Sequence, residues 1–281
     1  SDLNNIYLNV NAFYEERLKP TTYANATFNI NANGQLKNLW SVGAFTEYAL
    51  AYNDFYEPRV ADRFFRGGSR STFGVWVETN EAKKYSVSTE CVVTSKSLFS
   101  GKEISLTTNQ KFRFNDRFSL SHDFSFEPKI NDVGFAGKSS TDVILGRRNV
   151  QSISNTLSAK YNFNDKMGIT FKARHYVSTV DNKAFFTLLN DGSLAANNTF
   201  NKNVNQNTNF FNIDLVYTWQ FASGSFIYIV WKNAITNETD QVEKKYFKIF
   251  SNTMKADANN NLSLKIIYFL DYLQLKKKKK D

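Results

Sequence analysis

The sequence predicts an all-β protein, an antiparallel transmembrane β-barrel, and three observations lead to this expectation. Apolar and polar residues alternate over segments of about ten residues, as they do in strands with one apolar face. Aromatic residues recur near the ends of these segments, as in the interfacial girdles of membrane barrels. Short and long connections follow one another in turn. Together these features indicate about twelve visible strands, which could form part of a larger barrel.

Composition supports strands rather than membrane helices. Aromatic residues make up 16% of the 281 residues, with 26 Phe and 14 Tyr but only 3 Pro. Such residues favour strands, and the remaining positions are mostly small and polar. No apolar run approaches the roughly 18 residues that a transmembrane helix needs. The pattern therefore fits a sheet with one apolar and one wet face.

The clearest alternation runs from Phe211 to Phe221. One predicted face carries Phe211, Ile213, Leu215, Tyr217, Trp219 and Phe221, and the other is mainly polar. Successive side chains of a strand point to opposite faces, so this segment is apolar on one side only. The same pattern recurs around residues 24–31, 118–127, 153–163, 169–178 and 262–272.

The connections between these segments alternate in length. Short turns are predicted at Asn33-Gly34, Asn80-Glu81, Asn115-Asp116, Asn164-Asp165 and Ser223-Gly224. Longer polar loops are predicted at about 15–21, 53–71, 95–102, 129–143, 183–206 and 236–260. Short periplasmic turns and long external loops are typical of outer-membrane barrels. We therefore expect one barrel domain over residues 1–275, a Lys-rich tail over 276–281, and a location in the bacterial outer membrane.

The charge pattern argues against nucleic-acid binding. The net charge is +9, and Lys276–Lys280 with Asp281 contribute +4 of it, five lysines less one aspartate. The other basic residues are spread singly along the chain, whereas a nucleic-acid surface needs a basic cluster. Inward-facing Lys160, Lys172, Arg174, Lys265 and Asp271 are expected to line the lumen. The single cysteine, Cys91, excludes an internal disulfide and is expected to face lipid or core.

Catalysis and cofactor binding find little support in the residue pattern. His122 and His175 both fall in the apolar register, where a packed or interfacial histidine is expected. His122 and Asp123 are adjacent, so their side chains should point to opposite faces. No cluster has metal-ligand spacing and no phosphate-binding glycine loop occurs. We expect no enzyme activity, no cofactor and no metal.

Two motifs are candidates for loop or lumen binding or gating. The first is Tyr56-Glu57-Pro58-Arg59 followed by Arg63 and Arg66, which forms either a binding loop or a loop pinned by its own salt bridges. The second is Arg147-Arg148, near a predicted barrel mouth. These arginines could attract anions or could pair with Glu57 or Asp54 to hold the loops. The candidate residues are Tyr56, Glu57, Arg59, Arg63, Arg147 and Arg148.

Several strings resemble a family of uncharacterised outer-membrane β-barrel domains. They include 54–60 with 63–66, 145–149 with 155–157, 174–176, 212–217, 230–232, and 263–265 with 268–272. The resemblance implies that the chain is the C-terminal portion of a longer protein. In that family a module similar to family 9 carbohydrate-binding domains usually precedes the barrel. The end departs from the pattern, because Leu-Gln-Leu and lysines follow Tyr272.

Three functions follow from this reading. The first is a barrel without catalytic activity that binds a surface ligand or partner and has a glycan link through such a module. The alternatives are a porin-like solute channel and a structural subunit of an outer-membrane secretion or insertion complex. A barrel hydrolase ranks last. The expected partners are the outer-membrane bilayer, other outer-membrane proteins and glycans, without nucleic acid.

Overall fold

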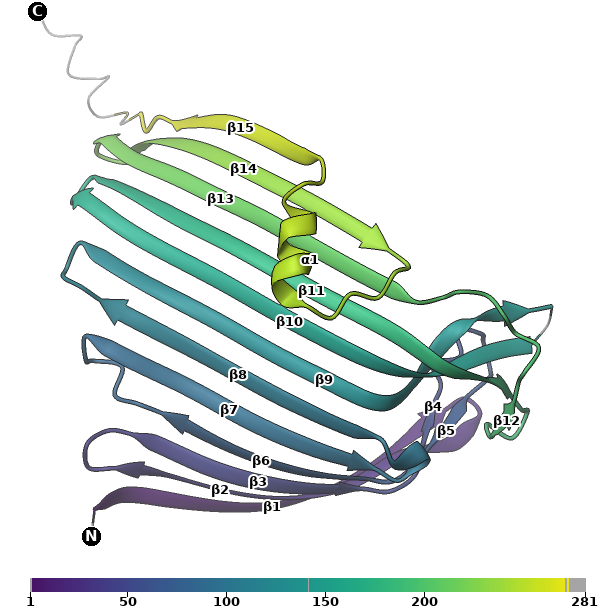
Figure 1. Ribbon diagram of the computed structural model, residues 1–281. Coiled ribbons are helices and arrows are strands. Elements are labelled where there is room, and N and C mark those ends of the chain that lie inside the picture. The colour runs from purple at the N-terminus through teal and green to yellow at the C-terminus, as the bar shows by residue number, and fades with distance from the viewer. Residues whose placement is uncertain (1, 141, 271, 273–281) are drawn as a thin grey trace, which may run out of the picture.

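The structure, a computed structural model, describes residues 2–140, 142–270 and 272 and is built around one large antiparallel sheet (Figure 1). Twelve strands follow one another in an up-and-down path, which agrees with the number predicted. The Lys-rich tail predicted at 276–281 lies outside the described residues. The strands of this path are β1 (Leu3–Leu18), β2 (Thr21–Leu36), β3 (Ser41–Ala49), β6 (Arg70–Glu78), β7 (Tyr85–Lys96), β8 (Lys102–Arg113), β9 (Phe118–Ser139), β10 (Asp142–Asn164), β11 (Met167–Leu188), β13 (Gln206–Ala222), β14 (Ser225–Thr239) and β15 (Ala258–Ile267).

The remaining elements lie in the connections. A short strand, β12 (Leu194–Ala196), pairs with β11. Strands β4 (Tyr52–Asp54) and β5 (Phe65–Gly67) form a separate two-stranded sheet. The helices are η1 (Leu98–Ser100) and α1 (Tyr246–Thr253). Of the described residues, none belong to a helix that is long and apolar enough to cross a membrane.

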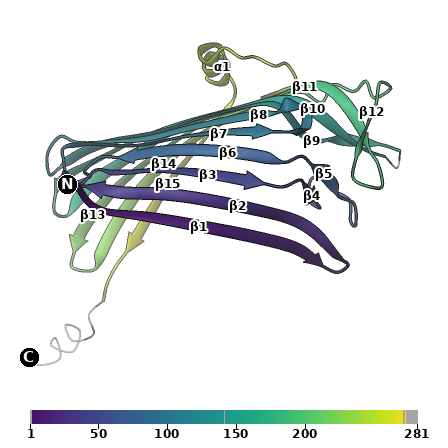
Figure 2. The ribbon, with the colours of Figure 1, turned by 90° about the horizontal axis from the view of Figure 1, so that it is seen from below.

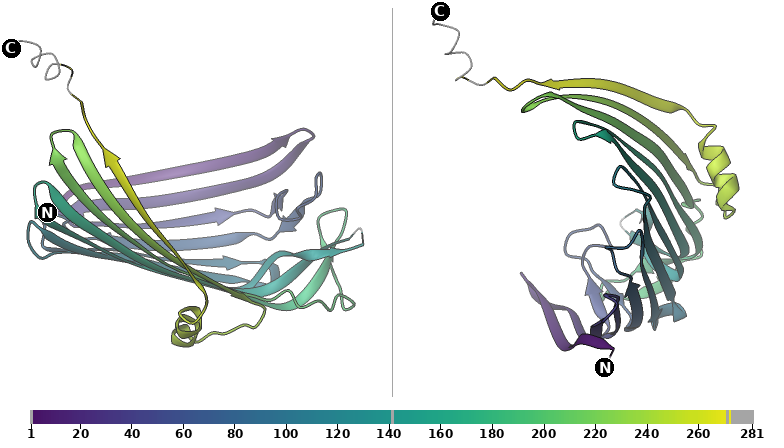
Figure 3. Two further views of the ribbon diagram at one scale, coloured as in Figure 1. Left: turned by 90° about the horizontal axis from the view of Figure 1, so that it is seen from above. Right: turned by 90° about the vertical axis from the view of Figure 1, so that its left-hand side faces the viewer.

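The main sheet curves into an open arc, with β1 at one edge and β15 at the other (Figure 3). Within the part of the chain that is described, no strand pairs with the outer edge of either strand. An all-β antiparallel sheet is therefore confirmed, whereas these residues do not close the sheet into a barrel.

The two faces of the sheet differ in chemistry because the pairing register keeps like residues together. Directly paired residues on neighbouring strands share a face. One row of such pairs crosses nine strands, from β1 to β11, with apolar or thiol side chains throughout. Its members are Leu8, Ala32, Ala44, Val75, Cys91, Leu106, Phe126, Ile153 and Val177. The opposite face carries Glu90, Thr107, Ser125 and Ser154 in one paired row.

Helix α1 shows which of these faces is convex. Its Ile249 packs in a buried cluster with Ile153 and Val177, which belong to the apolar face. The helix lies on the outer side of the arc (Figures 2 and 3). The convex face is therefore apolar and the concave face polar, which is the arrangement of a sheet with lipid outside and water inside.

The predicted turns are right in four places and wrong in one. Strands end beside Asn80-Glu81, Asn115-Asp116, Asn164-Asp165 and Ser223-Gly224. Asn33-Gly34, however, lies inside β2, where Gly34 pairs with Ile6 on one side and Val42 on the other. The turn falls instead at residues 37–40, where Leu39 has a φ of 65°. Asn-Gly favours a tight turn, but pairing on both edges keeps this one extended.

The predicted loop at 129–143 is also wrong, because β9 runs to Ser139 and β10 starts at Asp142. Two glycines face large polar side chains there: a Cβ on Gly134 would collide with the guanidinium of Arg148, and one on Gly146 with Asn182. This mixture of glycine and polar residues hides the strand pattern. The strand predicted over 262–272 likewise ends earlier, at Ile267, and Asp271 lies outside the described residues.

The hairpin of β9 and β10 helps to build a second packed region, in addition to the one under α1. It lies at the end of the sheet that carries the β4–β5 segment, which we call the long-loop end; the opposite end is the short-turn end. Phe65 of β5 is buried against Val143, Leu145 and Leu188 from β10 and β11. Thus the predicted 53–71 loop is an ordered segment that holds β4 and β5 and packs on the strand tips. This packing shapes the site described next.

Candidate functional site

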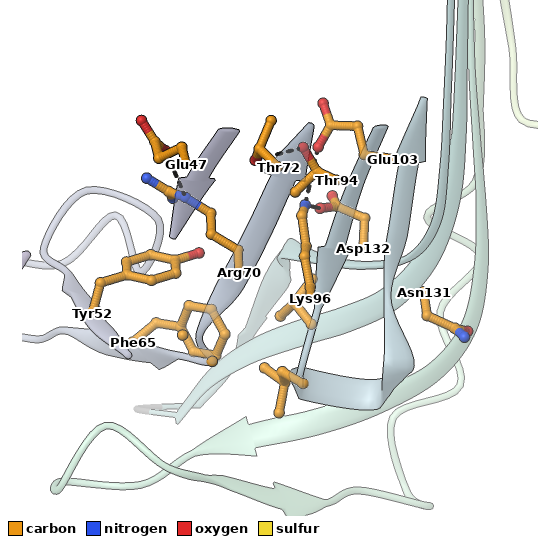
Figure 4. Close-up of a pocket in the computed structure, with 14 residues that line it drawn as sticks. Glu47, Tyr52, Phe65, Arg70, Thr72, Thr94, Lys96, Glu103, Asn131 and Asp132 are labelled. Carbon is orange, nitrogen blue, oxygen red and sulfur yellow. Dashed lines mark hydrogen bonds and ion pairs between the residues drawn. The ribbon is translucent and has the colours of Figure 1, made fainter. Parts of the chain in front are cut away.

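A cavity of about 290 Å³ opens beside the β4–β5 segment at the long-loop end (Figure 4). Successive strands of the sheet supply one wall, and β4 and β5 supply the other. The lining is mixed, with aromatic, hydroxyl, amide and charged side chains. The residues labelled in Figure 4 are Glu47, Tyr52, Phe65, Arg70, Thr72, Thr94, Lys96, Glu103, Asn131 and Asp132.

Five charged side chains form a continuous ion-pair network along one side of this cavity. Glu103 of β8 lies 2.8 Å from Lys129 of β9 and 3.2 Å from Lys96 of β7. Lys96 also lies 3.2 Å from Asp132, and Asp132 lies 3.3 Å from Arg148 of β10. The signs alternate, so each charged group has an opposite neighbour. Such a network ties four strands together and gives the cavity a fixed polar wall.

The other side of the cavity combines an ion pair with aromatic rings. The guanidinium of Arg70 lies 3.9 Å from the carboxylate of Glu47 and 5.4 Å from the centroid of the Tyr52 ring. Burial raises the pKa of the Tyr52 hydroxyl above its usual value, so this group stays a neutral donor at physiological pH. Phe65 is almost fully buried. An aromatic face beside fixed donors and acceptors suits a small polar ligand with an apolar side.

The first predicted motif packs on the strand tips. Tyr56 is 85% exposed, and the Glu57 carboxylate accepts a hydrogen bond from the backbone N–H of Phe135. The Arg59 guanidinium lies over the Phe135 ring, 4.7 Å from its centroid. Arg63 donates hydrogen bonds to the carbonyl oxygens of Leu188 and Leu189, at 2.7 and 3.1 Å.

These contacts hold the segment through hydrogen bonds and ring contacts, and not through the internal salt bridges that one alternative predicted. The salt bridge that involves the segment joins Asp62 to Arg17 of β1 at 2.6 Å, so the partner comes from outside the loop. None of the four residues lines the cavity. Their predicted role in binding or gating remains a prediction.

The two arginines of the second motif separate. Arg148 pairs with Asp132 and not with Glu57 or Asp54. It therefore belongs to the ion-pair network. Arg147 lies over the Phe99 ring at 5.7 Å, and its buried Nε makes no hydrogen bond to any described residue. The reason is their adjacency in β10, because successive side chains of a strand point to opposite faces of the sheet.

Sequence reasoning missed Tyr52, Lys96, Glu103, Lys129 and Asp132. A usable signal was present for three of them, since Lys96 and Glu103 lie at the ends of β7 and β8 and Tyr52 begins β4. Lys129 and Asp132 lie inside β9, in the segment that was predicted to be a loop. Their mutual pairing depends on the strand register, which no local pattern reveals.

The histidines lie on the convex apolar face, as expected. His175 is 3% exposed, and its Nδ1 lies 2.9 Å from the hydroxyl of Tyr246 in α1. That hydroxyl also accepts a hydrogen bond from Asn155, whose amide oxygen lies 3.3 Å from His122 Nε2. The ring of Phe250 packs edge-on against His175. The described residues contain no group of three or more His, Cys, Asp or Glu side chains placed to hold a metal ion.

Comparisons with known proteins give a family and a low-scoring structural alignment. A family model described as a domain of unknown function (DUF5916) matches residues 1–279. No curated protein matches the sequence. A solved NanC porin structure aligns with 94% of this chain and 100% of its own, at 10% identity and a TM-score of 0.29.

Proposed function

The chain belongs to the family of domains of unknown function DUF5916, and we propose that it forms the wall of a bacterial outer-membrane β-barrel that binds a ligand at its outer mouth. The domain has no catalytic role in this proposal. A closed barrel, the outer-membrane location and the ligand all belong to the proposal.

The observation that carries the location is the apolar row across nine strands on the convex face. Helix α1 covers Ile153 and Val177, but other members of the row, such as Leu8 and Val75, are exposed. Large exposed apolar surfaces are rare on soluble monomers. Within lipid, unpaired backbone groups cost several kcal/mol each, so a membrane sheet must be closed by pairing both edges. The edges at β1 and β15 are therefore paired in the membrane under this proposal.

The cavity beside β4 and β5 is the proposed ligand site. Rings stack on the apolar faces of sugars, while charged and hydroxyl groups bind their hydroxyls, so the mixture of Tyr52, Arg70, Glu47 and Asn131 favours an oligosaccharide. Tyr52 belongs to β4, Arg70 pairs with Glu47, and the Asn131 amide donates a hydrogen bond to the carbonyl oxygen of Phe99, so these groups are held before a ligand arrives. A preformed site loses less entropy on binding.

Fractionation of cells that produce the full-length protein tests the location. We expect the protein in the outer-membrane fraction, resistant to extraction by carbonate and by urea. Recovery of the folded protein in the aqueous fraction would contradict the proposal.

A glycan array probed with the purified full-length protein tests the ligand class. Tyr52→Ala should reduce binding of any recognised oligosaccharide by tenfold or more, while Tyr52→Phe should retain most of it. Tyr56→Ala is the matched control, because Tyr56 lies in the same segment and is 85% exposed outside the cavity. Equal losses from Tyr52→Ala and Tyr56→Ala, or binding to no glycan, would reject the sugar site.

A solute channel is a second candidate because the concave face carries polar residues along its length. Ionic conductance of the full-length protein in planar bilayers separates the two functions. A stable current that the recognised glycan blocks would indicate that the protein is both a channel and a glycan-binding protein. A stable current that the glycan does not affect would favour the channel alone.

A further inference from the structure

The short-turn end of the concave face carries basic side chains that differ from those at the cavity. At the cavity, each charged residue of the network has an opposite partner. At the other end, Lys111, Arg113, Lys160 and Lys172 take part in no ion pair with any described residue. The same wall therefore has ion-paired charges at one end and, among the described residues, bases without an ion-pair partner at the other.

The strand register places these four bases in two adjacent rows with hydroxyl residues between them. In the row nearer the turns, Arg113 of β8 pairs with Ser119, Ser119 with Lys160, and Lys160 with Thr170. In the next row Lys111 pairs with Ser121, Ser121 with Ser158, and Ser158 with Lys172. We call these eight residues the basic array: Lys111, Arg113, Ser119, Ser121, Ser158, Lys160, Thr170 and Lys172.

The array is open to ligands. None of its eight side chains makes a hydrogen bond with a described residue, and Lys160, Thr170 and Lys172 are exposed. Two shallow hollows of about 390 and 350 Å³ lie over it and share Lys111, Ser119 and Lys160 in their linings. Two acids lie beside the array. Asp116 lines one of the hollows, and Asp214 pairs with Lys172 across the β11–β13 boundary, where its carboxylate also lies 3.9 Å from Lys232.

Ammonium, guanidinium and hydroxyl groups together are donors suited to oxyanions. Neighbouring strands are about 4.8 Å apart, so Arg113 and Lys160 are about 10 Å apart along a row and Lys111 and Lys172 about 14 Å. That spacing exceeds a single phosphate. We propose that the basic array is a binding site for a linear polyvalent oxyanion that carries tetrahedral phosphate or sulfate groups.

Titration of the full-length protein in detergent with tripolyphosphate tests the site. We expect saturable binding that weakens as NaCl is raised, because exposed charges are screened by salt. Orthophosphate should bind at least tenfold more weakly, since it spans fewer donors. A trisulfated disaccharide is the second probe, and whichever of the two polyanions binds more tightly identifies phosphate or sulfate as the natural group.

Matched variants make the test specific. Lys111→Gln with Lys160→Gln should weaken tripolyphosphate binding by tenfold or more, and Ser121→Ala with Ser158→Ala by severalfold. Lys102→Gln with Lys265→Gln removes the same charge outside the array and should leave binding unchanged. Circular dichroism and heat-modified gel mobility check that each variant is folded.

Equal losses in the array and control variants would overturn the proposal, as they would indicate non-specific attraction. Equal affinity for orthophosphate and tripolyphosphate would also overturn it. The inference requires only that water reaches the concave face. The oxyanion site can therefore be refuted while the outer-membrane location stands. Oxyanion binding can also be observed when the proposed glycan site is refuted.

Discussion

At the residue scale, glycines that face aromatic rings set how closely two strands pack. Gly43 of β3 pairs with Trp76 of β6, and two positions along, Phe45 pairs with Gly74. A Cβ on Gly43 would lie 2.5 Å from the Trp76 ring, and one on Gly74 would collide with Phe45. Each ring thus fills the space over the opposite glycine, as in aromatic rescue of glycine in sheets.

Gly74→Val should therefore destabilise the protein. We expect a loss of about 1–3 kcal/mol in the free energy of unfolding, because overpacking displaces the Phe45 ring. Urea unfolding in detergent, followed by tryptophan fluorescence, measures it. Gly168→Ala is the control, since its Cβ would come closest to the Asn162 side chain at 3.1 Å, a group that can move. Equal stability of Gly74→Val and the parent protein would contradict the packing described.

Lys96 offers a second test at this scale, since it bridges Glu103 and Asp132. Lys96→Met leaves two carboxylates that share fewer cations. We expect the free energy of unfolding to fall by roughly 1–2 kcal/mol, and by less in high salt. Lys102→Met on the neighbouring strand removes an exposed lysine that makes no ion pair with a described residue, and it should be neutral. A double-mutant cycle with Asp132→Asn should show coupling. Additive effects would argue against a network.

At the element scale, helix α1 is a short helix held on the convex face by its aromatic residues. Tyr246→Phe removes the hydroxyl that contacts His175 and Asn155 while leaving the ring in place. We expect faster hydrogen exchange over residues 246–253. The increase should correspond to a loss of about 1–3 kcal/mol in the free energy that holds the helix on the sheet. Phe247 is 83% exposed, so Phe247→Leu should leave exchange unchanged. Unchanged protection in Tyr246→Phe would show that the polar contacts do not hold the helix.

We expect the start of α1 to be sensitive to acid. A hydrogen bond from Lys248, at 2.5 Å, and bonds from the backbone N–H groups of Lys244 and Lys245 lower the pKa of Glu243 to about 2. Because the folded pKa is depressed, this stabilisation is present above pH 4.5 and is lost as the pH falls towards 2.

An environment-sensitive dye on Phe247→Cys, in a Cys91→Ser background, should report release of the helix within that pH range. Glu243→Gln should remove the acid-dependent step. A step that persists in Glu243→Gln would assign it to another group.

How far these elements follow from the sequence depends on whether their signal is local. Alternation along 211–221 and 153–163 gave strands that the structure contains, because the faces of a strand differ by a two-residue period. The turn at Asn33-Gly34 was wrong because pairing with β1 and β3 overrides a local preference. Helix α1 was missed, since eight residues give a weak helical period and its stability comes from packing on His175 and Ile153. The cavity required register across bulges, which only the folded sheet supplies.

At the scale of the whole molecule, the central claim is that the convex face meets lipid and the concave face meets water. Both edge strands continue the apolar pattern, with Leu8 70% and Leu264 63% exposed on the convex side. Exposed edges of this kind invite further pairing. The three scales agree, since glycine–aromatic pairs shape the wall, long strands and their loops build the mouth, and the two faces give the wall its orientation.

Cysteine scanning of β8 tests this claim most directly. In the full-length protein with Cys91→Ser and any other cysteine removed, single cysteines are placed at residues 104–111 and treated with a water-soluble maleimide in intact membranes. Positions 105, 107, 109 and 111 should react, while 104, 106, 108 and 110 should be protected from the maleimide. In a second experiment the protected cysteines are labelled with a fluorophore in the unfolded protein, which is then refolded into vesicles. Brominated lipid should quench the fluorescence of these labels. Uniform reactivity along β8, without a period of two, would contradict the account.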